Sequence, residues 1–206
     1  MDASTVALRG GAVAAAGGGV VLAIGTVMNY VFASEVNVAG SALTAIGHIV
    51  LVFAFLGLLV LAGGRSGPLA ITGFVLGVLG TATMVGGVSL MIAGAGGVLT
   101  VAIEEVPSEV PAMLPFAAVA HFGFVLGFIL LAVAALRSGA YPRPAAVLLL
   151  VANVLIGVDL GQFGNFYVFS AGVVLNAVAL GWLAVTMWGA AATVRAANPT
   201  RVKAPA

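Results

Sequence analysis

Long apolar runs follow one another along this chain, and most of its charged residues lie in the short segments between them. Of the 206 residues, 63% are hydrophobic and 6% are charged. A soluble domain carries about 25% charged residues, so water could not solvate the surface of such a chain. A run of roughly 20 apolar residues is the length that crosses a bilayer as an α-helix. We therefore expect an all-α integral membrane protein whose solvent is the lipid bilayer.

The apolar runs predict a six-transmembrane-helix bundle that forms a single domain over residues 1–206. The third run is long and the fifth is short. The 29 glycines suit such a bundle, because small residues let the backbones of neighbouring helices approach closely. The expected spans cover residues of about 11–33, 42–62, 68–94, 112–136, 144–161 and 166–193.

The basic residues predict how the bundle is oriented. With six spans, all seven Lys and Arg residues fall on one side of the membrane, and five of the six acidic residues fall on the other. Cytoplasmic loops carry an excess of Lys and Arg, so we expect a multi-pass protein of the plasma membrane with both termini in the cytoplasm. Residues 195–206 then form a short basic cytoplasmic tail. The net charge of +1 gives no basic field that would attract nucleic acid.

Several classes of function lack the residues that they need. The chain has no cysteine, which excludes disulfides, thiolate metal sites and a cysteine nucleophile. It also has no phosphate-binding Gly-Lys-Ser/Thr loop, no His-Glu-x-x-His and no Gly-x-Ser-x-Gly. We therefore expect no hydrolase, kinase or nucleotide-binding activity. The composition is compatible with a chain that acts alone, as a homo-oligomer or within a larger membrane complex.

The two histidines of the chain lie inside apolar runs with similar surroundings. His48 occurs in "TAIGHIVLVFAF" and His121 in "AVAHFGFVLGF", and each is followed seven residues later by a phenylalanine, Phe55 or Phe128. Each run ends in Arg-Ser-Gly, which begins 17 residues after His48 and 16 after His121. We interpret this as a weak internal repeat that relates helix 2 to helix 4. Both helices run in the same direction, so at about 1.5 Å per residue the two imidazoles are expected at one depth in the outer leaflet.

Two imidazoles at one depth on two helices suit bis-histidine ligation of haem b. His48 and His121 are then the axial ligands, and Phe55 and Phe128, two turns below on the same faces, pack against the macrocycle. This predicts a small haem-b-binding protein for electron transfer, or a subunit of a respiratory complex. One feature argues against haem: its propionates usually pair with basic groups, and the outer side has no Lys or Arg.

A metal ion is the second interpretation of the pair. Asp159 could join His48 and His121 as a third ligand to zinc or copper. Met84 and Met91 are seven residues apart, share a helical face, and carry the thioether sulfur that suits Cu(I).

The third interpretation needs no cofactor. Polar side chains often form hydrogen bonds between membrane helices, and the histidines would then be structural residues in a transporter, channel or assembly subunit. For the same reason we expect Asn153 in the fifth run and Asn176 in the sixth to bond between helices.

Overall fold

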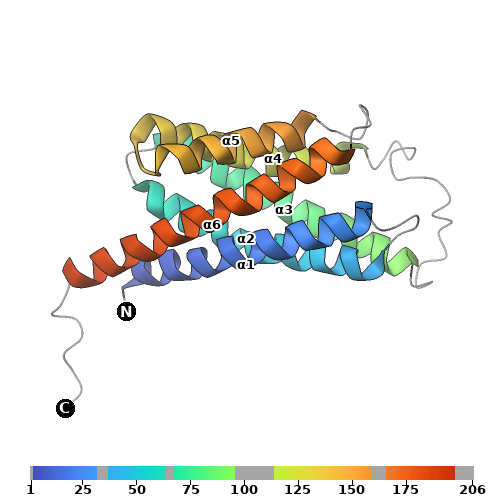
Figure 1. Cartoon of the computed structure of the whole chain (residues 1–206), viewed down its shortest axis with the longest axis horizontal. Helices are drawn as coiled ribbons and strands as arrows, with labels where there is room; N and C mark the ends of the chain where they lie inside the picture. Colours follow the sequence, from blue (N-terminus) through green and yellow to red (C-terminus); the bar gives the residue numbers. More distant parts are fainter. Residues whose placement is uncertain (1, 32–36, 64–66, 96–113, 159–165, 198–206) are drawn as a thin grey trace, which may run out of the picture.

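The computed structural model describes residues 2–31, 37–63, 67–95, 114–158 and 166–197. These residues form six α-helices and no strand, which confirms the all-α prediction for the described part of the chain. The helices are α1 (Ala3–Val31), α2 (Val38–Ala62), α3 (Gly67–Ala95), α4 (Leu114–Ser138), α5 (Arg143–Val158) and α6 (Phe166–Ala197) (Figure 1).

Five of the six helices are long and apolar enough to cross a membrane, as a helical membrane bundle requires. The exception is α5, whose 16 residues extend about 24 Å, less than the roughly 30 Å of a hydrocarbon core. The last residues of the predicted fifth span, 159–161, lie outside the described residues. Helix α1 begins at Ala3, well before the predicted start near residue 11, and so includes Arg9. Arginine is tolerated near a helix end because its long side chain can carry the charge towards the interface.

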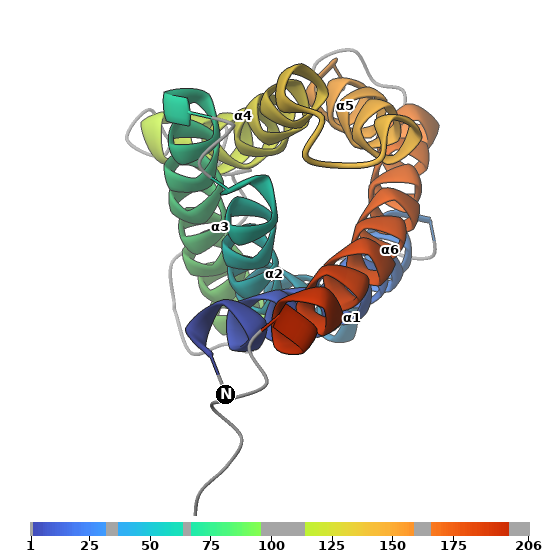
Figure 2. The ribbon, with the colours of Figure 1, turned by 90° about the vertical axis from the view of Figure 1, so that its left-hand side faces the viewer.

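The six helices form a closed ring in which each packs against its neighbours in sequence and α6 returns to α1 (Figure 2). Neighbouring helices run in opposite directions, so α2 and α4 are parallel. These two helices also meet inside the ring, where α2 makes contacts with α4 and with α6. The interior is therefore a packed core whose largest buried side chains include Phe55, Phe128 and Leu183.

Glycines line the two closest helix pairs, α1–α2 and α3–α4. A Cβ added to Gly11 of α1 would lie 2.5 Å from the Cα of Gly57 on α2, so no other residue fits there without a shift. In the second pair, a Cβ added to Gly123 of α4 would lie 2.8 Å from the Cα of Gly80 on α3. Close approach through small residues is how membrane helices gain packing without a hydrophobic driving force between them.

The turn between α4 and α5 is tied to the end of α2. The hydroxyl of Tyr141, which is 3% exposed, donates a hydrogen bond to the carbonyl of Leu58 at 2.8 Å. Gly63 and Gly139 follow α2 and α4 with φ angles of 59° and 67°, a conformation that favours glycine after a helix. This end of the bundle is thus held by both backbone and side-chain contacts.

All four arginines that the structure describes lie at this same end. Arg9 is near the start of α1, Arg137 is in the last turn of α4, Arg143 begins α5 and Arg195 is near the end of α6. Because the helices alternate in direction, these four termini share one end of the ring (Figure 1). The described arginines are thus distributed as the sequence predicted, while the cytoplasmic location of this end stays a prediction.

Candidate functional site

His48 lies on the face of α2 that points into the ring and is 4% exposed. Its Nδ1 is 2.8 Å from the carbonyl oxygen of Thr44, one turn earlier on the same helix. A carbonyl only accepts hydrogen bonds, so Nδ1 carries the hydrogen and the neutral ring keeps a lone pair on Nε2. A metal-ligating histidine is commonly oriented in this way, with its other ring N–H donated to a backbone carbonyl.

His121 is half-buried on α4, and its imidazole faces the backbone carbonyl of Ile156 on α5. Its Nε2 is buried and has no hydrogen-bond partner among the described residues. A buried polar atom without a partner is unusual, and it can indicate a group that completes the site. No described residue therefore binds Nε2 of His121, although the backbone carbonyl of Ile156 lies near the ring.

Three phenylalanine rings fill the place where α2 and α4 meet. Phe55 and Phe128 stack directly on each other with ring centroids 4.2 Å apart. Phe124, one turn before Phe128 on α4, packs edge-on against Phe128 with ring centroids 5.1 Å apart. Its ring is tilted against the His48 imidazole, with centroids 5.2 Å apart. Each of the three rings is at most 5% exposed. We call these three side chains the aromatic wall.

The predicted site residues are therefore brought together in part. Phe55 and Phe128 meet, and His48 contacts α4 through Phe124. His121 is three residues before Phe124, about 4.5 Å away along the axis of α4. However, His121 faces α5 and His48 faces Phe124, so the two imidazoles have different neighbours.

The ligand atoms at this site favour haem binding, whereas the packing of the side chains opposes it. Nε2 of His48 and Nε2 of His121 both suit a haem iron, and phenylalanine rings are suitable neighbours for a macrocycle. The Phe124 ring, however, occupies the space beside His48, so ligation by His48 requires that this ring turn away.

A polar cluster lies on the side of His48 away from the arginines. Ser41 Oγ donates to Asn29 Oδ1 at 3.3 Å, and Asn29 Nδ2 donates to Thr44 Oγ1 at 3.4 Å. The Thr44 hydroxyl in turn donates to the carbonyl of Gly40 at 2.9 Å. This cluster joins α1 to α2 with uncharged groups, one to two turns from His48.

The residues proposed for a metal ion do not form a cluster among the residues that the structure describes. No group of three or more His, Asp or Glu side chains there could hold a metal. Met84 lies partly buried on α3. Asp159 and the side chain of Met91 fall outside the described residues.

Asn153 and Asn176 bond between helices, as the sequence predicted. Both are at most 1% exposed, and Asn153 Nδ2 donates to Asn176 Oδ1 at 2.9 Å and to the Leu149 carbonyl at 2.8 Å. This pair joins α5 to α6 within the core.

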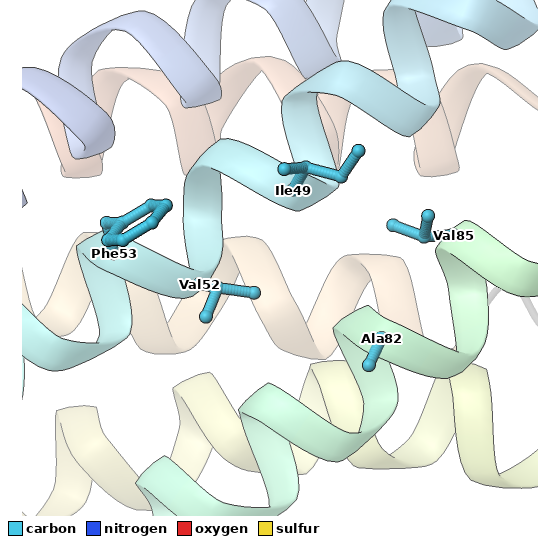
Figure 3. A pocket seen from close by; sticks show the side chains of 5 residues that line it. All are labelled: Ile49, Val52, Phe53, Ala82 and Val85. Carbon is cyan, nitrogen blue, oxygen red and sulfur yellow. The ribbon is translucent and has the colours of Figure 1, made fainter.

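An open groove lies between α2 and α3 on the outer surface of the ring. It has a volume of about 380 Å³ and is lined by Ile49, Val52, Phe53, Ala82 and Val85 (Figure 3). Ile49 and Phe53 are 50% and 59% exposed, on the outer surface of the ring. The lining is entirely apolar, which suits contact with lipid chains and offers no ligand to a cofactor.

The sequence patterns missed Phe124 and the carbonyl of Thr44. The seven-residue interval after each histidine selected Phe128, whereas Phe124 contacts His48 because α2 and α4 meet near this level. A backbone carbonyl has no sequence signature, so the hydrogen bond to Nδ1 could be found only from the structure.

Comparisons with protein-family models, with curated proteins and with solved structures found no match for this chain.

Proposed function

We propose that the chain is a small membrane protein that binds haem b through His48 and His121 and transfers electrons, alone or as a subunit of a respiratory complex. The observation that carries this proposal is the state of the two Nε2 atoms. Nδ1 of His48 is held by the Thr44 carbonyl, which leaves Nε2 as the ligand atom. Nε2 of His121 is buried without a partner in the described structure. A bound haem would supply one-electron redox chemistry at this position.

In this proposal the chain has six spans, with both termini in the cytoplasm. The gathering of the described arginines at one end supports the orientation. The internal repeat is supported by the glycine-lined packing of both α1–α2 and α3–α4, in which α2 and α4 are the second members of their pairs.

The other groups near the histidines have defined tasks in the proposed protein. The Thr44 carbonyl fixes the tautomer and orientation of His48. Phe55 and Phe128, which are fully buried, would keep water away from the redox centre. The Asn29–Ser41–Thr44 cluster places uncharged polar groups, in place of basic side chains, on the side where propionates would need partners, and Asn29 Nδ2 has a second N–H beyond its bond to Thr44.

Titration of the purified protein with haem b tests the proposal. We expect one haem per chain, with at least a tenfold loss of affinity in His48→Ala and in His121→Ala. Phe124→Ala removes the ring that packs on His48 and should bind haem at least as tightly as the wild type. Thr193→Val, which replaces an exposed residue near the end of α6, is the control and should leave binding unchanged. Binding that is equal in all five proteins would exclude ligation by this pair.

The second candidate is a non-enzymatic membrane protein, a transporter, channel or assembly subunit, in which the histidines only pack. The stacked pair Phe55–Phe128 and the contact of Phe124 with His48 favour it, because they close the space between α2 and α4. In this case His48→Ala and His121→Ala lose modest stability and the protein binds no haem. Elemental analysis of the same sample tests the copper or zinc alternative with His48, His121 and Asp159.

A further inference from the structure

Arg9 and Trp188 form a contact at the outer surface of the bundle, where α1 packs against α6. The Arg9 guanidinium carbon lies 5.2 Å from the centroid of the Trp188 ring. This is the geometry of a cation–π interaction, which leaves the hydrogen-bond donors at the edge of the guanidinium free. Trp188 is 51% exposed, so the contact is open on one side.

The hydrogen-bonding capacity of Arg9 is not met by the described residues. Its Nε is buried and has no partner there. A guanidinium has five N–H donors, accepts no hydrogen bond and stays charged. The single acidic residue in the described part of the chain, Asp2, is seven residues earlier, about 10 Å along the helix. The permanent charge of Arg9 therefore has no carboxylate partner in the described part of the chain, and the N–H groups at the edge of its guanidinium can bind an anion from outside it.

The surface beside this contact has room for a ligand. Gly10 and Gly189, the next residues after Arg9 and Trp188, are both exposed. A Cβ added to either glycine would meet no atom within 4 Å. The backbone there is uncovered on both helices, and the opening is on the outside of the ring, where lipid is expected.

We propose that Arg9 and Trp188 bind the phosphate of an anionic phospholipid. Guanidinium and phosphate pair through parallel charge-assisted hydrogen bonds, which a neutral acceptor cannot match. Tryptophan is favoured at the level of the lipid headgroups, and Arg9 lies about 9 Å from the start of α1, a depth from which its side chain reaches this level. The uncovered backbone at Gly10 and Gly189 accommodates the glycerol group and the start of the acyl chains. This site is independent of the proposed haem.

Thermal unfolding in detergent with added lipid tests this proposal. We expect phosphatidylglycerol to raise the apparent Tm of the wild type by about 2–4 °C, as a ligand that binds only the folded state does. Phosphatidylcholine and inorganic phosphate should give a much smaller shift. Arg9→Gln should lose most of the phosphatidylglycerol shift. Arg143→Gln, which removes an exposed charge at the same end of the bundle, should retain it.

A second variant and a second measurement complete the test. Trp188→Leu keeps the charge of Arg9 but removes the ring beneath it, and should also reduce the phosphatidylglycerol shift. It takes the place of Arg9→Gln in the test if that variant does not fold. Native mass spectrometry should find one fewer retained phosphatidylglycerol in either variant than in the wild type. Three outcomes contradict the proposal: equal shifts in the wild type and both site variants, an equal loss in Arg143→Gln, or a full shift from inorganic phosphate alone.

Discussion

His48 and His121 are held differently although their sequence surroundings are alike. His48 is fixed by the Thr44 carbonyl and covered by Phe124, whereas Nε2 of His121 is buried without a partner in the described structure. The similarity of the two runs predicted both residues but not this difference. The difference arises because α2 faces α4 inside the ring, while this side of α4 faces α5. At the scale of single residues, the sequence therefore located the two histidines within apolar helices but not the groups that each one contacts.

Replacement of Tyr141 by Phe tests the contact that ties the α4–α5 turn to α2. Burial raises the pKa of the Tyr141 hydroxyl, so the group stays protonated and donates to the Leu58 carbonyl. We expect Tyr141→Phe to lower the free energy of unfolding by about 1 kcal/mol, the usual value of one such bond. Thr83→Val is the control, since that hydroxyl bonds only to Leu79 within its own helix and its loss should cost less. Denaturation in detergent measures both variants, and an unchanged stability of Tyr141→Phe would show that the bond contributes nothing.

The Asn153–Asn176 pair can be measured by a double-mutant cycle. We expect a coupling energy of about 0.6 kcal/mol between Asn153→Leu and Asn176→Leu, the mean for hydrogen bonds between membrane helices. The two substitutions should therefore cost less together than the sum of each alone. Strict additivity would contradict the contact seen between α5 and α6.

At the scale of the helices, the sequence predicted the number of helices and their approximate positions well, and the residues at which they begin and end less well. Apolar run length is a strong signal because the bilayer sets it. The early start of α1 was missed because Arg9 interrupts the apolar pattern without interrupting the helix. The glycines indicated close packing, but not which helices they join, since that depends on how the ring closes.

Glycine substitutions test these close contacts between helices. A Cβ added to Gly80 would overlap the backbone nitrogen of Phe124 on α4, so Gly80→Ala should force α3 and α4 apart. We expect a loss of about 1–3 kcal/mol, as for other overpacked sites. Gly17→Ala is the matched control, because Gly17 is exposed and its added Cβ would meet no atom within 4 Å. That variant should be neutral or slightly stabilising. Equal effects in the two variants would contradict the predicted importance of the α3–α4 contact.

At the scale of the whole molecule, the ring could not be derived from the sequence. Short connections favour antiparallel neighbours, but the contact of α6 with α1 and the meeting of α2 with α4 depend on side chains far apart in the chain. The charges, in contrast, predicted that the arginines share one end, because each lies next to a helix terminus whose direction is fixed by helix order.

Single cysteines can test the orientation, because the natural chain has none. Ser4 lies at the arginine end and Val38 at the opposite end, and both are exposed, Val38 to 46%. We therefore choose the variants Ser4→Cys and Val38→Cys. If both termini are cytoplasmic, a membrane-impermeant thiol reagent added to intact cells should label Val38→Cys and leave Ser4→Cys unlabelled until the cells are opened. The reverse pattern would invert the predicted topology.

The most direct test of the central claim is the visible absorption spectrum of the protein purified from membranes, oxidised and then reduced with dithionite. We predict a Soret band that shifts on reduction, with the sharp reduced bands of a six-coordinate b-type haem, and the loss of this spectrum in His48→Ala and in His121→Ala. A protein that folds and has no Soret band, or one whose spectrum is unchanged in both variants, would contradict bis-histidine ligation by His48 and His121.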